Sequence, residues 1–514
     1  MLPKFSNEPY LDFSRPENQE PMKKALADLK AKSSTVYDLV IGGKHIKAKE
    51  EFVSYNPSDK SPVGTFQKAT VKEAEQAMKA ALKAFETWRY MPAIERAGIV
   101  LRASRMMKQR RFEFDAAMIL EEGKNWLEAD ADFAEAVDFL EFYAREAIRY
   151  DQPGGVTTYP GESNEVRYIP LGVGIVIPPW NFPCAIMAGM TTAAAVTGNT
   201  VVLKPSSDAP LLAALFMDVL EKAGMPAGVV NLLTGPGGSV GDYLVEHPKT
   251  RFISFTGSKS VGLGIIEKAA KTQKGQIWVK RVVAEMGGKD CIIVDSEADV
   301  ADAVEGVAIA AFGFQGQKCS ACSRAIVDAK VYYEFVRLLV ERVKKITVGP
   351  TADRANWMGP VINERAYNSH LEYIKVGKEE GKLAIGGKPG PEGGWFIQPT
   401  VFVDIPRNAR LAQEEIFGPV LAVIKADNYS DALAIANGTE YGLTGAVYSR
   451  NREKIYRAKR EFMVGNMYIN RKCTGALVDV QPFGGFNMSG TDSKAGGRDY
   501  LLLFLQAKSM TERF

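Results

Sequence analysis

Short, continuous apolar runs alternate with helical segments along the stretch from residue 172 to residue 258. Four such runs lie at 172–177, 200–204, 229–233 and 252–255. A strand that is buried on both faces is apolar throughout, whereas a half-exposed strand alternates apolar and polar residues. Parallel strands also need long crossover connections, and the helical segments supply them. The stretch therefore predicts an α/β fold built on a doubly wound, parallel, nucleotide-binding sheet.

A second alternating block runs from residue 291 to about 480. It contains apolar runs at 291–294, 324–327 and 445–448 and a helical segment at 332–345. We interpret this block as a second α/β domain that carries Cys319 on a loop.

The composition changes at residue 151 to Gly, Pro, Tyr and Thr, and an extended segment follows at 165–169. The tail at 500–505 is strongly apolar, and an exposed edge of this kind usually finds a partner strand, often in another subunit. We therefore expect a homo-oligomer, either a dimer or an assembly of dimers. The predicted division is a dinucleotide-binding domain at 1–150 and 172–284, a catalytic domain at 285–488, and a small β oligomerisation extension at 151–171 and 489–514.

Charge and cysteine content exclude several classes of protein. Lys plus Arg (64) nearly balance Asp plus Glu (61), so no basic field is available to bind nucleic acid. Five cysteines in 514 residues are too few for a disulfide framework, which suits a reducing compartment. No apolar signal core or membrane-length run occurs, so we expect a cytoplasmic protein without a membrane partner. The three histidines are far apart in the sequence, so a histidine metal site or a Ser-His-Asp triad is not expected.

The loop at 312–324 holds the candidate nucleophile. Cys319 ends a small, polar, glycine-containing turn and follows Lys318, a position that favours an exposed thiolate. An isolated cysteine is more often a buried small hydrophobe.

Cys319 and Cys322 also have the spacing of a redox pair or of half a zinc site. Zinc needs about four ligands, and no second closely spaced Cys or His pair occurs, so we predict no metal, while a reversible disulfide stays open.

Polar and glycine-containing turns follow the predicted strands at 178–181, 204–207, 234–238 and 256–258. Ligands of parallel sheets bind at these carboxyl ends. Ser258 is placed to cap the next helix and to present free backbone N–H groups to a pyrophosphate. Neither the dinucleotide Gly-x-Gly-x-x-Gly fingerprint nor a Gly-Lys-Ser/Thr phosphate loop occurs.

Glu285 lies between apolar residues and glycines at the end of the first block. A buried carboxylate is costly unless it is paired or partly protonated, and a raised pKa suits a general base. The alternative is an ordinary salt-bridged glutamate at a domain junction.

Six of these motifs stand in the order found in the aldehyde dehydrogenase superfamily, which the chain resembles from about residue 38 to the tail. They lie at 179–183, 204–206, 255–258, 285–289, 315–319 and 414–419. The resemblance implies a small-molecule aldehyde as substrate and NAD as cofactor.

What the resemblance implies for catalysis is a thiol mechanism. Cys319 attacks the aldehyde carbon, and the Asn181 amide and the backbone N–H of Cys319 hold the oxyanion. Glu285 activates the water that hydrolyses the thioester. Lys204 is assigned to the adenosine ribose, and Glu415 and Phe417 to the nicotinamide end. The implied cofactor-binding set is Val176, Pro178, Trp180, Lys204, Ser206, Ser207, Gly237, Gly241, Phe255, Thr256, Gly257, Ser258, Val261, Glu285, Met286, Glu415 and Phe417.

Residues 318–320 and 474–486 resemble the branch of the family that oxidises L-glutamate 5-semialdehyde, the open form of 1-pyrroline-5-carboxylate, to L-glutamate in proline degradation. The implied substrate contacts are Phe182 and Phe483 along the aliphatic chain, and Ser320, Gly475 and Ala476 at the α-carboxylate, without a full positive charge. Another small aldehyde, such as succinate semialdehyde, is the alternative.

Two positions depart from the family pattern. Many members that prefer NAD have a glutamate where Ser207 stands, so the use of NADP stays open. Cys322 replaces a small residue, and its oxidation with Cys319 would act as a redox brake.

Overall fold

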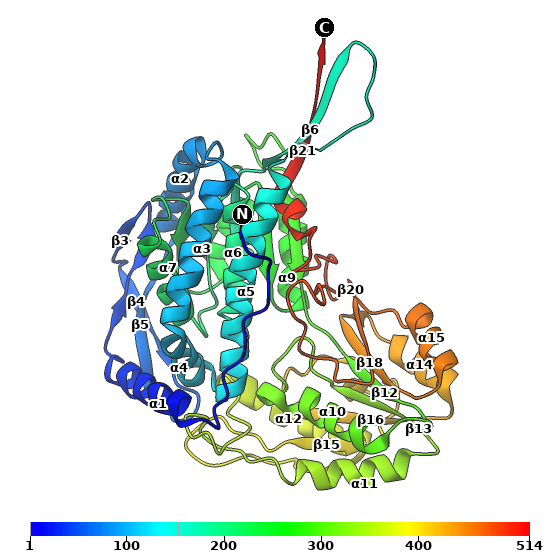
Figure 1. Cartoon of the computed structure of the whole chain (residues 1–514). Coiled ribbons are helices and arrows are strands. Elements are labelled where there is room, and N and C mark those ends of the chain that lie inside the picture. The colour runs from blue at the N-terminus through cyan, green and yellow to red at the C-terminus, as the bar shows by residue number, and fades with distance from the viewer. Residues whose placement is uncertain (1, 153) are drawn as a thin grey trace.

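The computed structural model describes residues 2–152 and 154–514 and contains two large sheets, each flanked by helices (Figure 1). The first sheet has seven strands in the order β11-β10-β7-β8-β9-β2-β3. Strands β7 to β11 run parallel, and β2 pairs antiparallel with β9 and β3. The strands are β2 (Leu39–Ile41), β3 (Lys44–Ile46), β7 (Val173–Ile177), β8 (Thr200–Leu203), β9 (Val230–Leu232), β10 (Phe252–Thr256) and β11 (Arg281–Glu285).

The strand order of this sheet reverses between β7 and β10. From β7 the chain continues to β8 and β9 on one side, whereas β10 and β11 lie on the other side. Neighbouring strands at such a reversal leave a crevice outside their carboxyl ends, where open α/β sheets bind their ligands. The predicted doubly wound sheet is therefore confirmed, and the crevice lies beyond Ile177 and Thr256.

Helices cover both faces of the first sheet. One face packs on α2 (Val71–Trp88), α8 (Gly238–Glu246) and α9 (Lys259–Ala270). The other packs on α3 (Ala93–Gln109), α4 (Arg111–Glu122), α5 (Trp126–Tyr150), α6 (Ala185–Val196) and α7 (Leu211–Lys222). Helix α2 begins with the expected capping box, in which Thr70 and Glu73 satisfy each other's backbone N–H groups.

The second sheet also has seven strands, in the order β14-β15-β16-β13-β12-β18-β19. Only β14, at one edge, is antiparallel to its neighbour. The strands are β12 (Cys291–Val294), β13 (Arg324–Asp328), β14 (Lys382–Ile385), β15 (Thr400–Val403), β16 (Val420–Ala426), β18 (Thr444–Tyr448) and β19 (Asn466–Ile469). The helices of this block are α10 (Val300–Phe312), α11 (Tyr332–Val343), α12 (Glu364–Glu380), α13 (Arg410–Gln413), α14 (Tyr429–Asn437) and α15 (Arg452–Glu461).

A two-stranded arm projects from the body of the molecule, with the C-terminal end at its tip (Figure 1). Strand β6 (Glu162–Pro170) pairs antiparallel with β21 (Leu505–Arg513). The smaller elements are α1 (Pro16–Ala31), β1 (Val36–Tyr37), β4 (Glu50–Tyr55), β5 (Pro62–Lys68), η1 (Gly313–Gly316), β17 (Tyr441–Gly442), β20 (Phe486–Asn487) and η2 (Tyr500–Phe504). Within the described residues, no helix has the length and apolar character needed to cross a bilayer.

The apolar tail differs from the expected exposed edge. Residues Tyr500–Phe504 form η2, and the rings of Tyr500 and Phe504 pack on Tyr143 and Phe252 with centroid separations of 5.3 and 5.4 Å. The tail is apolar because it enters the core of the first block, and only the segment after it forms the arm. The domain division proposed from the sequence stays a prediction.

Candidate active site

The candidate nucleophile follows a turn with an unusual backbone. Helix α10 ends at Phe312, and in η1 Phe314 and Gln315 adopt left-handed conformations with φ of 48° and 58°. Such angles are costly for residues with side chains and persist only where the surroundings enforce them.

The side chain of Gln315 supplies that enforcement. Its amide donates to the carbonyls of Gly123 and Pro360 at 3.1 and 2.7 Å, and its oxygen accepts from the N–H of Gly359 at 2.9 Å. Gly316, with φ of 68°, then lies against the backbone carbonyl of Gly418, where a Cβ atom has no room. The turn that presents Cys319 is therefore fixed by contacts from distant parts of the chain.

The electrostatics around Cys319 differ from the sequence-based expectation. Lys318 does not stabilise the thiolate, because its ammonium pairs with the Glu128 carboxylate at 2.6 Å. Burial raises the pKa of the Cys319 thiol, and nearby carboxylates raise it further, led by Asp290. The thiol is therefore protonated in this state, and it needs a proton acceptor before it reacts.

The neighbours of Cys322 in the structure are Arg324 and Cys473. Cys322 is buried, its Sγ donates to the Arg324 carbonyl at 3.4 Å, and it neighbours the Cys473 thiol. Cys473 in turn donates to the carbonyl of Ser320 at 3.4 Å. All five cysteines are free thiols, so the structure gives no support to a disulfide between Cys319 and Cys322.

Asn181 reaches the same loop from the first sheet. It follows β7 in the connection to α6, and its buried amide donates to the Gln317 carbonyl at 3.0 Å. An asparagine amide has two N–H donors, so one stays available for a second acceptor near Cys319. The adjacent Trp180 ring packs edge-on against Phe417 with a centroid separation of 5.5 Å, so a contact joins this connection to the loop that carries Phe417.

Glu285 ends β11 and accepts hydrogen bonds from the far end of the chain. Ser493 donates through its N–H (3.1 Å) and its hydroxyl (2.6 Å), and the N–H of Gly485 donates at 3.3 Å. Burial raises the pKa of Glu285 to about 7, and these donors limit the rise. No ion pair involves Glu285 among the described residues, so the alternative of a salt-bridged glutamate is wrong.

Two glycines after Glu285 allow the groups to converge. A Cβ on Gly288 would lie 2.6 Å from the Cys319 carbonyl oxygen, and a Cβ on Gly287 would collide with the Glu415 carboxylate. The N–H of Gly288 donates to Glu415 at 3.0 Å, while burial raises the pKa of Glu415 to about 7. Cys319, Glu285 and Glu415 are therefore close enough for the two carboxylates to shift the pKa of the thiol.

Residues at the starts of α8 and α9 have features that suit a dinucleotide. Gly237 and Gly241, at the start of α8, have open space where a Cβ would lie. Ser258 holds the N-cap position of α9, but its side chain makes no capping bond and lies 3.4 Å from Ser260. The first N–H groups of this helix therefore lack a side-chain cap and are available to a phosphate.

Lys204 lies at the end of β8 and is 3% exposed. Its ammonium donates to the carbonyls of Gly235 (2.9 Å) and Pro205 (3.2 Å), and burial lowers its pKa to about 8. A ribose hydroxyl is a suitable third acceptor for this ammonium.

The other residues assigned to the cofactor lie in or near β7, β8, β10, α9 and β11. The Phe255 ring packs under Gly257, where a Cβ would come within 2.6 Å of it, and the Thr256 hydroxyl contacts the Met190 sulfur at 3.5 Å. Val176 is buried in β7 and Val261 is in the first turn of α9, whereas Pro178, Ser206 and Met286 follow β7, β8 and β11 in the chain.

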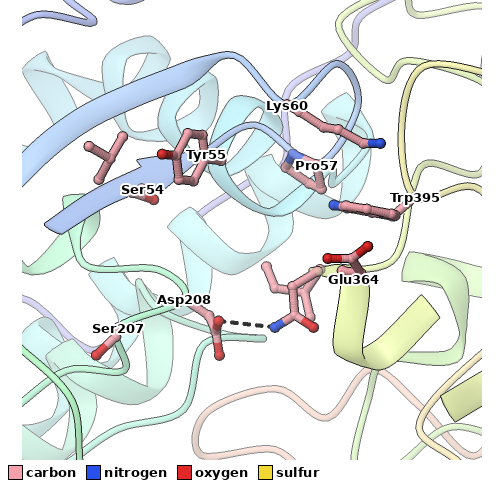
Figure 2. Close-up of a pocket in the computed structure, with 11 residues that line it drawn as sticks. Ser54, Tyr55, Pro57, Lys60, Ser207, Asp208, Glu364 and Trp395 are labelled. Atoms are coloured by element: carbon pink, nitrogen blue, oxygen red, sulfur yellow. Dashed lines mark hydrogen bonds between the residues drawn. The ribbon is translucent and has the colours of Figure 1, made fainter. Parts of the chain in front are cut away.

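A cavity of about 340 Å³ opens beside Ser207 (Figure 2). The Ser207 hydroxyl is buried and has no hydrogen-bond partner, so it is free to bond a ligand. The next residue, Asp208, is held by the Asn363 amide at 3.0 Å across the cavity. No carboxylate stands at position 207 itself, as the sequence indicated.

The residues predicted to bind the substrate differ in their exposure. The Phe182 and Phe314 rings pack at 6.4 Å, and Ser320 is buried with its carbonyl accepting from Thr444 at 3.4 Å. Gly475 is exposed with φ of 79°, and Ala476 follows it. Phe483 is half-buried, and Gly484 after it approaches the Glu285 carboxylate.

Sequence reasoning missed three groups at this end of the site. Glu128 binds Lys318, Phe314 packs against Phe182, and Lys472 approaches Gly475. Glu128 lies on α5 within a helical stretch that reads as core. Lys472 stands two positions before the start of the 474–486 motif, and this proximity was the only signal in the sequence.

Comparison with known proteins agrees with this geometry. The model of the aldehyde dehydrogenase family matches residues 45–510, and the chain belongs to that family. It is 54% identical, over the full length of both chains, to a 1-pyrroline-5-carboxylate dehydrogenase of Geobacillus thermodenitrificans, and 53% identical, again over the full length of both, to one of Bacillus cytotoxicus. A 1-pyrroline-5-carboxylate dehydrogenase from Thermus, solved with bound NAD, superposes with a TM-score of 0.98 at 50% identity and covers both chains fully.

Proposed function

We propose that this enzyme oxidises L-glutamate 5-semialdehyde, the open form of 1-pyrroline-5-carboxylate, to L-glutamate with reduction of NAD. The observation that carries the proposal is the convergence of Cys319, Asn181 and Glu285, from three separate parts of the chain, on one crevice. Full-length relatives that carry the name 1-pyrroline-5-carboxylate dehydrogenase support the substrate. The product places the reaction in proline degradation.

The first chemical step forms a bond between the Cys319 sulfur and the aldehyde carbon. The thiol gives its proton to solvent water and attacks as the thiolate, and the carbonyl oxygen becomes an oxyanion that accepts from the free N–H of Asn181 and the backbone N–H of Cys319. NAD, when bound, supplies the hydride acceptor for this chemistry. Loss of hydride from the former aldehyde carbon leaves a thioester on Cys319.

Hydrolysis of the thioester requires a base on the opposite side of the reacting carbon. Glu285 accepts a proton from water, which then attacks the thioester and releases L-glutamate and the Cys319 thiol. A pKa of about 7 suits this role, because the carboxylate is partly ionised near neutral pH and still a useful proton acceptor.

The residues of the crevice would hold the dinucleotide along its length. Lys204 and Ser207 would bond the adenosine ribose, and the N-terminus of α9 the pyrophosphate. Glu415 would bond the nicotinamide ribose, with Phe417 packed beside the nicotinamide. Because Ser207 bears no charge to repel a 2′-phosphate, we propose that NADP is also accepted.

We further propose that the protein is a homo-oligomer in the cytoplasm. The arm exposes Ile169 on β6, and the second sheet has open edges at β14 and β19. An exposed strand edge is a template for pairing with another chain. An arm that packs on a second copy would therefore cover Ile169 on the arm and an open edge of the second sheet.

The thiol mechanism is tested by Cys319→Ala. This variant is expected to bind NAD as the unchanged enzyme does, measured by calorimetry, and to form no NADH from 1-pyrroline-5-carboxylate. Cys291→Ala on β12 is the matched control, since Cys291 is buried in the second sheet and makes no contact with the proposed substrate. Undiminished turnover by Cys319→Ala contradicts the mechanism.

The substrate is tested by comparing kcat/KM for glutamate 5-semialdehyde with that for succinate semialdehyde. The proposal expects glutamate 5-semialdehyde to be preferred by at least about tenfold, because a site that bonds the amino acid end loses those bonds with the shorter substrate. A preference for succinate semialdehyde would overturn the assignment.

A further inference from the structure

Three cations and one carboxylate gather where the residues before Gly475 meet the Cys319 loop. The cations are Lys318, Arg471 and Lys472, and the carboxylate is Glu128. The charges are interdependent, since both Lys318 and Lys472 lower the pKa of Glu128, with burial opposing them. The cluster therefore carries an excess of positive charge at the predicted amino acid end of the substrate.

Two of the three cations have partners within the protein. Lys318 pairs with Glu128 at 2.6 Å. Arg471 donates to the carbonyls of Thr474 and Gly475 at 2.9 and 3.0 Å, and its guanidinium lies over the Tyr468 ring at 4.5 Å. Arg471 thus holds the backbone of the loop in place through Nη2 of its guanidinium.

Lys472 is the cation without a partner. Across the part of the chain that the structure describes, its ammonium takes part in no hydrogen bond, ion pair or contact with an aromatic ring. It is also half-buried, and burial followed by repulsion from Lys318 lowers its pKa. A partly desolvated cation without a counter-ion is costly, so a site of this kind gains from an anionic ligand.

The position of Lys472 indicates where such a ligand would bind. A Cβ placed on Gly475 would lie 3.5 Å from Lys472 Cε and 3.8 Å from its Nζ. Gly475 is exposed and has a left-handed conformation. The Lys472 ammonium therefore lies beside the turn to which the resemblance assigns the substrate α-carboxylate.

We propose that Lys472 is a specificity-determining residue that forms an ion pair with the α-carboxylate of the substrate beside the Gly475 turn. The inference rests on the proposed function and changes one part of the sequence-based expectation, in which backbone N–H groups and Ser320 hold the carboxylate without a full positive charge. Lys472 selects amino acid aldehydes over aldehydes that lack the carboxylate, and takes no part in the chemistry at Cys319.

The test uses two aldehydes that differ only in the α-carboxylate. Glutamate 5-semialdehyde has it, and 4-aminobutanal is the same molecule without it. Lys472→Met removes the charge and keeps most of the side-chain volume, while Lys472→Arg keeps the charge. Lys459→Met, on the exposed face of α15, is the matched control for loss of a lysine.

For Lys472→Met we expect kcat/KM for glutamate 5-semialdehyde to fall by at least about tenfold, mainly through KM, since a charge-assisted bond is lost. The value for 4-aminobutanal should change by less than about twofold, and Lys472→Arg should recover part of the loss. Binding of L-glutamate, measured by calorimetry without turnover, should weaken in Lys472→Met while binding of 4-aminobutanoate does not.

Two results overturn the inference. One is an unchanged KM for glutamate 5-semialdehyde in Lys472→Met, and the other is an equal loss on both aldehydes, which indicates a purely structural role. The proposed function fails separately, if the unchanged enzyme itself does not oxidise glutamate 5-semialdehyde. The two failures are therefore distinguishable in one set of assays.

Discussion

Glu285 has the surroundings of a base that works near neutral pH. Desolvation favours its protonated form, whereas three donors from Ser493 and Gly485 favour the carboxylate. The balance leaves the pKa at about 7, above the ordinary value for a glutamate. Removing the donors would raise the pKa of Glu285 further. The hydrogen bonds therefore keep part of the Glu285 population ionised at pH 7 and able to accept a proton.

This environment predicts a pH dependence for thioester hydrolysis. Below pH 7 Glu285 is protonated and accepts no proton, so the steady-state rate should rise with pH through about 7 and then level off. Glu285→Gln should lower the steady-state rate by at least about 100-fold. The variant should still give a rapid burst of NADH, measured by stopped flow, because hydride leaves before the water attacks. A lost burst would place Glu285 in the first step instead.

At the scale of the element, the turn of residues 313–316 combines backbone strain with tight packing. Left-handed Phe314 and Gln315 precede Gly316, which touches the Gly418 carbonyl in the loop that carries Phe417. The turn therefore joins the nucleophile to the loop on the nicotinamide side. Any shift of this contact would move both together.

Gly316→Ala should consequently lower both stability and activity. The new Cβ meets the Gly418 carbonyl and the backbone stays at a positive φ, so we expect the melting temperature to fall by several degrees and kcat/KM by at least about tenfold. Gly264→Ala, on α9, is the control, since a Cβ there meets nothing within 4 Å and should stabilise by about 0.5–1 kcal/mol. Equal behaviour of the two variants would show that the contact is unimportant.

The elements themselves could be read from the sequence to different extents. The strands of the first sheet were predictable because burial on both faces requires uninterrupted apolar runs, as in β7 and β8. The turn before Cys319 was not, since Phe314 and Gln315 give no local signal for a left-handed backbone. Their conformation depends on Gly123 and Pro360, which lie far away in the chain.

The same limit applies to the charges of the site. Lys318 is next to Cys319 in the sequence and was expected to favour its thiolate, but its partner Glu128 lies on another helix. Cys319, Glu285 and Asn181 were identified only because the motifs around them resemble a known family. Lys472, by contrast, lies outside the motif itself, and its unpaired state is visible only in three dimensions.

At the scale of the whole molecule, the arm of β6 and β21 is the segment that the body does not cover. It exposes backbone edges and Ile169, and it extends away from both sheets (Figure 1). A single two-stranded ribbon is marginally stable in water, so its nine-residue strands point to support from another copy of the chain.

Removal of residues 507–514 should therefore reduce the size of the assembly. We expect a smaller sedimentation coefficient for the shortened chain than for the full one, measured by analytical ultracentrifugation at equal concentration. Tyr456→Ser, at a position 63% exposed on α15, is the control for loss of an exposed apolar group away from the arm. An unchanged coefficient would mean that the arm plays no part in association.

The hydrogen bonds of Glu285 also bear on how the enzyme matures. The strands of the nucleotide sheet are complete at residue 285, whereas Gly485 and Ser493 emerge from the ribosome about 200 positions later. A nascent chain that has folded its first sheet therefore lacks the donors that tune the base. Such a chain has the strands of the nucleotide sheet before it has a competent hydrolytic centre, so complete turnover requires the last segment to dock.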